Sequence, residues 1–498
     1  MAQKPAALRW LSVSRKNTEM KEIIMKRILL SAMSIAVFTL SAADIKTVEP
    51  AEDAVVPLLT DAQKAYLDMS SDLRREKFVD TKFRRKEMGH PAEQVPGEKK
   101  PREVYWPKTV RLAWEPVDGV DEYKVTVKDV KSGATVVEQS VKGTSVNVDN
   151  LEIAAEYAWT VSGGGAIGGG KFKTEDRAPR LVRFPGVPNV RDIGGWIGLD
   201  GRRVRQGLVF RSAGLNNNAA MAYYSVDELR KMGKDKEVKE AAEEAKKRLD
   251  QLLAWQADPK TMDLDDEEYV AWNKRYAGEP VAKFLSSRIH YAKKDVEAGG
   301  KSKVEKGMET GKSRVEGENG EYIRKRFGIK TDIDLRSSKE CFGMTGSPLG
   351  PAVKWFHFSS DAYGGMQGSW GKEEFAKVFR VFLDEKNYPI DFHCIAGADR
   401  TGSVAYILCG LLGADEDRLA RDWETTAFCS HGVDFCHEQR YDKLVNGFKK
   451  NFPADTVRER LEKYVLSLGF TEEDIAKFRG IMLEGAPMVK ASRLEVSP

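Results

Sequence analysis

The residues best suited to chemistry lie in one short segment, His-Cys-Ile-Ala-Gly-Ala-Asp-Arg-Thr, at positions 393–401. An apolar run ends just before this segment at Phe392, and another begins near Thr401. The segment is therefore predicted to be a loop between a strand and the N-terminus of a helix. Backbone N–H groups and the positive end of the helix dipole favour an anion at such a place.

The same positive field favours a reactive thiol at Cys394, because it stabilises the thiolate and lowers the thiol pKa. Gly397 gives the backbone the freedom to curl around a tetrahedral anion. Arg400 offers a planar fork for two phosphate oxygens, and Thr401 can donate a hydrogen bond to the sulfur. These residues predict hydrolysis of a phosphate ester through a cysteinyl-phosphate. A buried structural cysteine is the alternative, but it leaves Arg400 and Gly397 unexplained.

Several loop positions are predicted to surround the bound phosphate and form the substrate-binding set. They are His393, Ile395, Ala396, Gly397, Ala398 and Thr401.

Ester cleavage also needs an acid that protonates the departing oxygen, and two aspartates are candidates. Asp361 lies in a Ser-Ser-Asp-Ala-Tyr-Gly-Gly segment after an apolar run, where a loop could close over a substrate. Asp399 lies inside the phosphate loop itself. We place Asp361 first and keep Asp399 as the alternative.

The loop, with its ending Asp-Arg-Thr-Gly at 399–402, resembles the bacterial branch of the protein tyrosine phosphatase superfamily. Further segments at 189–195, 200–204, 210–212 and 334–337 resemble that family in content and order, so that the resemblance covers about residues 180–485. It implies a phosphatase acting most readily on phosphotyrosine in proteins or on a small phosphoester. Ala398 stands where relatives active on phosphoinositides often carry lysine. A phytase-like inositol polyphosphate phosphatase and a catalytically weak phosphoester-binding protein remain the alternatives.

Apolar strand-like and helix-like runs alternate from about residue 178 to 487, which predicts an α/β domain with a mixed or parallel sheet flanked by helices. The strands are expected at 328–335, 353–358 and 389–393, and the helices at 372–383 and 402–412. A charged stretch at about 216–321 is predicted to be a helical insertion.

An all-β module is predicted ahead of this domain, at 104–177, because apolar and polar residues alternate there with turn signals between the runs. It resembles a fibronectin type III module. Residues 44–103 are polar and partly helix-compatible, and they predict a spacer. Residues 488–498 form a tail.

The N-terminus predicts export, to the periplasm or the medium. Residues 1–43 contain Met-Lys-Arg at 25–27, an apolar run and then Ser-Ala-Ala. This pattern is typical of a cleaved signal peptide. Translation of the protein can start at Met25. The run is too short for a permanent membrane span. With 80 basic and 76 acidic residues the net charge is only +4, which argues against nucleic acid as a partner.

Five cysteines are an odd number for an exported protein, so at least one thiol is expected to stay unpaired. Cys429 and Cys436 are close enough in sequence to form a disulfide, although two buried thiols are an equal alternative. With His431 and His437 they also form a weak zinc-like cluster, but no paired Cys-x-x-Cys element is present. No metal or cofactor is expected.

Overall fold

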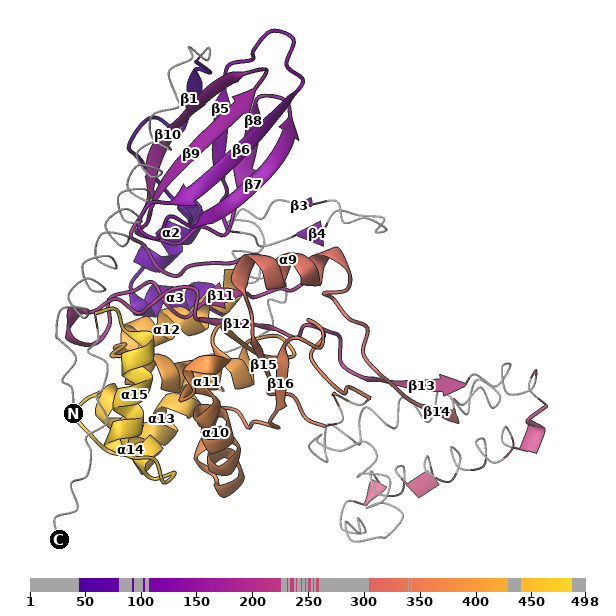
Figure 1. The fold of residues 1–498 in the computed structure, drawn as a ribbon. Helices are drawn as coiled ribbons and strands as arrows, with labels where there is room; N and C mark the ends of the chain where they lie inside the picture. The colour runs from indigo at the N-terminus through magenta and orange to yellow at the C-terminus, as the bar shows by residue number, and fades with distance from the viewer. Residues whose placement is uncertain are drawn as a thin grey trace, which may run out of the picture. The chain divides into compact units, whose positions relative to one another are not determined.

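The computed structural model forms two compact units (Figure 1). The sandwich unit contains the described residues of Met1–Thr60 and Pro107–Arg180, and the α/β unit those of Asp61–Trp106 and Leu181–Pro498. The structure describes residues 44–79, 92–93, 102–103, 107–224, scattered positions between 231 and 258, 304–338, 340–341, 343–428 and 440–485. The predicted signal peptide, most of the predicted insertion and the tail lie outside these residues. Within them, no helix combines the length and the apolar character needed to cross a bilayer.

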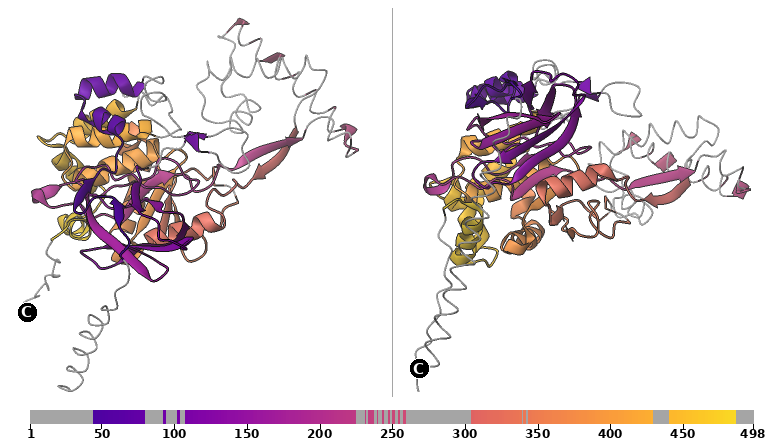
Figure 2. Two further views of the ribbon diagram at one scale, coloured as in Figure 1. Left: turned by 90° about the horizontal axis from the view of Figure 1, so that it is seen from above. Right: turned by 45° about the horizontal axis from the view of Figure 1, so that its top comes forward.

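Two sheets make up the sandwich unit, whose strands are drawn in purple in Figure 2. The first sheet has the order β1 (Thr47–Glu49), β5 (Val110–Trp114), β8 (Ser145–Val148). The second has the order β2 (Ala54–Val56), β10 (Ala166–Thr174), β9 (Glu156–Gly163), β6 (Glu122–Asp129), β7 (Thr135–Lys142). Alternate residues of β6 are buried, as its period-two pattern predicted. Trp114, Val125, Trp159 and Phe172 are among the residues of the shared core.

The predicted spacer at 44–103 divides between the two units. Its first part adds β1 to β5 and β2 to β10, and its next part forms α2 (Asp61–Asp68) and α3 (Ser71–Val79) of the α/β unit. Strands of three residues are too short for alternation to show in the sequence. Both helices have a low mean hydropathy, so neither signals burial. Two short strands, β3 (Ala92–Glu93) and β4 (Arg102–Glu103), pair with each other.

A five-stranded sheet is the centre of the α/β unit, which agrees with the predicted class. Its order is β11 (Arg191–Asp192), β12 (Val209–Ala213), β17 (Ile390–Cys394), β15 (Thr331–Asp334), β16 (Lys354–His357). All pairs are parallel except β11 with β12. Every residue of β12, β17 and β15 is buried. Strands buried on both faces are typical of a sheet covered by helices.

Besides α2, α3 and the scattered helical positions between 231 and 258, the α/β unit has helices that lie between or after the sheet strands in the chain. They are α9 (Glu318–Phe327), α10 (Ser369–Phe382), α11 (Asp399–Leu411), α12 (Glu416–Glu424), α13 (Tyr441–Asn451), α14 (Val457–Leu466) and α15 (Glu472–Met482). Short 3-10 turns lie at η1 (Leu199–Gly201), η3 (Tyr363–Gln367), η4 (Glu385–Asn387) and η5 (Thr425–Phe428). Every residue of α11 from Thr401 onward is buried, so this helix is surrounded by protein, as expected for one that is apolar on all sides.

The ends of the predicted insertion form a two-stranded pair rather than helices. β13 (Ala220–Tyr224) runs antiparallel to β14 (Val304–Glu309). Between these strands the structure describes only scattered positions, some of which are helical.

Candidate active site

The loop predicted from the sequence joins the end of β17 to the start of α11. Cys394 is the last residue of β17 and is 1% exposed, while Asp399 is the first residue of α11. Gly397 has a φ of 66°, a conformation that costs an L-residue energy but not glycine. The loop therefore lies at the carboxyl end of a central parallel strand and at the N-terminus of a long helix, as predicted.

Cys394 has the environment of a reactive thiol. Burial acts to raise its pKa, but the charge of Arg400 and hydrogen bonds from Thr401 and Gly397 outweigh this, and the pKa of Cys394 is lowered. The thiolate is the nucleophilic form of cysteine.

Arg400 is held by a residue that the sequence analysis missed. Its Nη1 and Nη2 donate to the two carboxylate oxygens of Glu340 at 2.7 and 3.1 Å. Glu340 also accepts hydrogen bonds from the backbone and hydroxyl of Ser337, at 2.7 and 2.8 Å. Burial acts to raise the pKa of Glu340, but Arg400 and Ser337 outweigh burial, and this pKa is lowered overall. The carboxylate therefore stays charged. Glu340 follows the strand β15 by a turn, and no local spacing marks it.

The loop carbonyls are anchored by the segments at 189–195 and 210–212. The side-chain amide of Asn189 donates to the Ala396 carbonyl at 2.8 Å, and Arg211 donates to the Gly397 carbonyl at 2.7 Å. Arg191 donates to Asn189 at 2.6 Å. These side chains therefore hold the backbone of the loop in place from within the protein.

Asp422 of α12 connects the two buried arginines. Its carboxylate accepts from Arg191 Nε at 3.0 Å and also pairs with Arg211. Burial acts to raise the pKa of Asp422, but the two arginines lower it overall. Asp422 is separated from Arg191 by 231 positions, and the sequence alone does not point to it.

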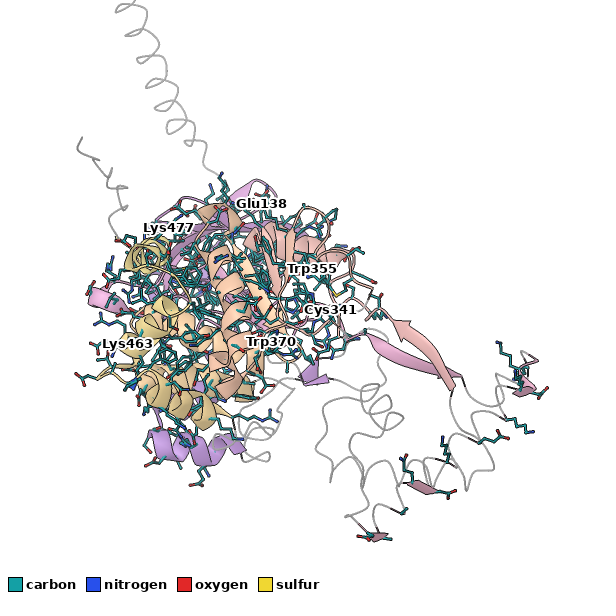
Figure 3. All side chains as sticks on the ribbon, turned by 90° about the horizontal axis from the view of Figure 1, so that it is seen from below. Glu138, Cys341, Trp355, Trp370, Lys463 and Lys477 are labelled. Atoms are coloured by element: carbon teal, nitrogen blue, oxygen red, sulfur yellow. The ribbon has the colours of Figure 1, made fainter. Side chains whose placement is uncertain are left out.

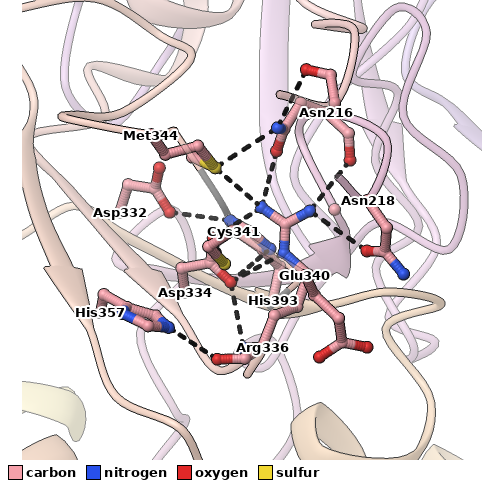
Figure 4. Close-up of polar contacts among 12 residues, drawn as sticks. Asn216, Asn218, Asp332, Asp334, Arg336, Glu340, Cys341, Met344, His357 and His393 are labelled. Atoms are coloured by element: carbon pink, nitrogen blue, oxygen red, sulfur yellow. Dashed lines mark hydrogen bonds and ion pairs between the residues drawn. The ribbon is translucent and has the colours of Figure 1, made fainter. Parts of the chain in front are cut away.

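A buried ionic network surrounds His393, the residue before Cys394 (Figure 4). Nε2 of His393 lies 2.9 Å from Oδ1 of Asp332. Arg336 donates to both carboxylate oxygens of Asp334, at 2.9 and 2.6 Å, and to Asn216 at 2.6 Å. Burial acts to lower the pKa of His393, but Asp334 and Asp332 raise it to about 9. The network ties the ends of β15 and β17 to the segment that follows β12.

The predicted substrate-binding residues therefore separate into two groups. Ile395 is 36% exposed, whereas the side chains of His393, Thr401 and Ala398 are buried. His393 faces Asp332 within the protein, so its side chain supports the loop from below. Among the predicted groups, this leaves the backbone of the loop, Ile395 and Arg400 as those that a bound anion could reach.

The two candidate acids have different surroundings. Arg440, at the start of α13, donates to Asp399 Oδ1 at 3.2 Å. Burial raises the pKa of Asp399 to about 6, against the opposing effects of Arg440 and Arg400. Asp361 instead accepts from the backbone N–H of Ala362 at 2.8 Å. A Cβ placed at Gly365 would lie 2.1 Å from the carboxylate of Asp361. Asp361 is therefore packed into its own turn, as is common for aspartate.

The other described cysteines have the properties of structural thiols. Cys341, labelled in Figure 3, and Cys409 are buried and unpaired. Burial raises the pKa of Cys409 to about 12, and it also raises the pKa of Cys341. Cys429, His431, Cys436 and His437 lie outside the described residues. Within the described part of the chain, no three histidine, cysteine or acidic side chains gather as a metal site.

Comparisons with known proteins agree with the motifs. A model of the tyrosine phosphatase family matches residues 182–288 and 311–484, more than half of the chain. The chain is also similar to a tyrosine-protein phosphatase from Nostoc commune, with 24% identity over 136 residues. That match covers 23% of the chain and 46% of the relative, so the chain spans about half of the relative's length. The interruption in the family match falls within the predicted insertion.

Proposed function

Because the chain belongs to the tyrosine phosphatase family, we propose that it hydrolyses phosphate monoesters through a cysteinyl-phosphate on Cys394. The observation that carries this proposal is the pairing of a thiol of lowered pKa with a charged, preoriented arginine at one helix N-terminus. Such a pair binds a phosphate dianion and supplies the nucleophile at the same place.

In the first step the Cys394 thiolate attacks phosphorus, the sulfur–phosphorus bond forms and the bond to the ester oxygen breaks. The acid gives its proton to that oxygen. In the second step a water molecule loses a proton to the carboxylate and attacks phosphorus. The sulfur–phosphorus bond breaks, the thiolate returns and inorganic phosphate leaves. Arg400 balances the charge on the phosphoryl oxygens in both steps.

The sequence places Asp361 first as the acid, but the surroundings of the two aspartates lead us to propose Asp399, with Asp361 as the alternative. A pKa of about 6 leaves part of the Asp399 population protonated near neutral pH, which suits an acid in the first step and a base in the second. Asp361 could serve only after its turn opens, because its carboxylate now caps Ala362.

Phosphotyrosine in proteins is the substrate class that we propose. Ile395 is a partly exposed apolar side chain of the loop, and positions 396 and 398 are alanines without charge. An apolar rim suits an aryl phosphate better than a polyphosphate, whose extra charges call for cations. The name of the Nostoc commune relative agrees with this class. We also propose export, with cleavage before Asp44, which N-terminal sequencing of the mature protein tests.

Hydrolysis of 4-nitrophenyl phosphate in the presence of a chelator tests the mechanism. Wild type should be active, Cys394→Ser inactive, and Arg400→Ala reduced on the order of a thousandfold. Cys409→Ser is the matched control, since that thiol is buried and its pKa is raised. Activity that survives Cys394→Ser would reject the mechanism. Phosphotyrosine peptides, phosphoinositides and phytate, compared by kcat/KM, decide the substrate class, and binding without turnover would indicate a phosphoester-binding protein.

A further inference from the structure

Helices α2 and α3, residues 61–79, lie outside the segments that the family model matches, yet they belong to the α/β unit. We propose that this α2–α3 segment positions the phosphate loop, and that Arg74 is the positioning residue through which it acts. The inference rests on the proposed function for its catalytic meaning. Its structural basis is a series of contacts from α3 to α12 and from α12 to the loop.

Arg74 is the main contact between α3 and α12. It is 1% exposed, and its Nε donates to Glu424 at 2.7 Å. Nη1 donates to the Met69 carbonyl at 2.8 Å, and Nη2 pairs with Asp417. Asp417 and Glu424 lie near opposite ends of α12. A buried charge is stable only when its partners stay in place, so Arg74 fixes α12 along its length.

Other contacts attach the segment to the elements that follow α12. Tyr66 is fully buried, and its ring meets that of Phe428 edge to face, with 5.5 Å between the ring centroids. Arg75 pairs with Asp442 in the first turn of α13. The α2–α3 segment therefore holds α12, η5 and the start of α13 together.

These elements carry the residues that hold the phosphate loop. Asp422 lies between Asp417 and Glu424 on α12 and binds Arg191 and Arg211, and Arg211 donates to the Gly397 carbonyl. A rotation of α12 would therefore move an anchor of the loop.

Two further contacts would carry a displacement of α12 or α13 to the residues around Cys394. Trp423 of α12 packs on α11, where a Cβ at Gly402 would lie 2.6 Å from the Trp423 ring. On α13, Asp442 lies two positions after Arg440, the residue that pairs with Asp399. Displacing the α2–α3 segment would thus reach the loop, the first turn of α11 and the proposed acid.

Variants of the full chain test the inference with readouts that do not require turnover. We compare Arg74→Met and Arg74→Lys with Glu76→Ala, a control on the exposed side of α3 whose glutamate side chain is 70% exposed. The pH dependence of Cys394 alkylation by iodoacetamide, followed by mass spectrometry of the Cys394 peptide, reports the thiolate. Calorimetry with tungstate reports the shape of the loop, and kcat and the melting temperature are measured alongside.

Arg74→Met should move the midpoint of Cys394 alkylation to higher pH by about one unit and weaken tungstate binding about tenfold. The kcat for 4-nitrophenyl phosphate should fall on the order of tenfold to a hundredfold, because small misplacements of catalytic groups have such effects. Arg74→Lys should lie between wild type and Arg74→Met, since lysine keeps the charge but cannot bridge two carboxylates.

A lower melting temperature with an alkylation profile and tungstate affinity equal to those of Glu76→Ala would overturn the inference. If Arg74→Met fails to fold, Asp417→Asn decides, because that carboxylate is 45% exposed and its loss is milder. Wild-type protein that hydrolyses none of the phosphoesters, while the alkylation profile still shifts in Arg74→Met, would reject the proposed function and support the positioning role.

Discussion

Arg400 is oriented by another residue of the chain, Glu340. The bidentate contact with Glu340 fixes the plane of the guanidinium, and Ser337 fixes Glu340 in turn. An arginine oriented in advance loses less conformational entropy when it binds phosphate. The acidic partner also keeps Arg400 charged, since Glu340 raises the pKa of Arg400 against the effect of burial.

Glu340→Gln should lower kcat/KM for 4-nitrophenyl phosphate about tenfold to a hundredfold, with little change in melting temperature. Glutamine keeps the size of the side chain but cannot accept both Arg400 donors with full charge. Glu373→Gln on α10 is the control, because Glu373 is exposed and pairs only weakly with Lys377, at 3.2 Å. Equal kcat/KM values for the two variants would show that Arg400 needs no partner.

The pKa of Asp399 and its contact with Arg440 predict how the rate of hydrolysis depends on pH. An acid works while protonated, so the rate on a poor leaving group should fall as the pH rises through the Asp399 pKa of about 6. Arg440 stabilises the carboxylate and lowers that pKa. Arg440→Ala should therefore move the falling limb to higher pH, by about one unit, and Asp399→Asn should remove it. Measuring kcat against pH with an alkyl phosphate checks both changes.

Lys443→Ala, an exposed lysine of the same helix, is the control for Arg440→Ala. A falling limb that persists in Asp399→Asn and disappears in Asp361→Asn would move the acid to Asp361.

Among the elements, the contact between the phosphate loop and β12 depends on Gly397. A Cβ there would lie 2.4 Å from the Ser212 carbonyl oxygen and 2.8 Å from the Ala213 nitrogen, and φ is 66°. Gly397→Ala should reduce the free energy of unfolding by roughly 1–3 kcal/mol and abolish most activity, because backbone atoms cannot give way as side chains do. Denaturant unfolding and kcat measure the two effects.

Gly364→Ala is the matched control. A Cβ at Gly364 meets no atom within 4 Å, so this variant should retain stability and activity. Wild-type activity in Gly397→Ala would contradict the loop geometry.

Local patterns predicted the elements that carry chemistry. The apolar runs around Cys394 predicted β17, the loop and α11, and the helix expected at 372–383 is α10. Glu340 and Asp422 were missed because they meet Arg400 and Arg191 across 60 and 231 positions. Contacts between distant residues leave no periodic signal, whereas strands and helices are periodic.

At the scale of the whole molecule, contacts between distant residues also explain why residues 44–103, predicted to be a spacer, divide between the two units. β1 and β2 are edge strands of three residues, recognisable only through their pairing with β5 and β10. The helices α2 and α3 have charged sequences, and Arg74 is buried only because α12 offers two carboxylates. The polar composition of this segment predicted a spacer, because the carboxylates that pair with Arg74 lie more than 340 positions away in the sequence.

The sandwich unit has a hydrophobic core of its own, which predicts that damage to it should leave catalysis intact. Phe172 is fully buried there and stacks on Tyr157, with 5.6 Å between the ring centroids. Phe172→Ala should cost the sandwich unit about 3–5 kcal/mol, because the lost contacts and the cavity add. Calorimetry should show one transition moving to lower temperature, while kcat for 4-nitrophenyl phosphate stays within about twofold of wild type, as expected for units with separate cores. A parallel fall in kcat would show instead that an intact sandwich supports the active site, and the catalytic unit would then have to be redrawn to include it.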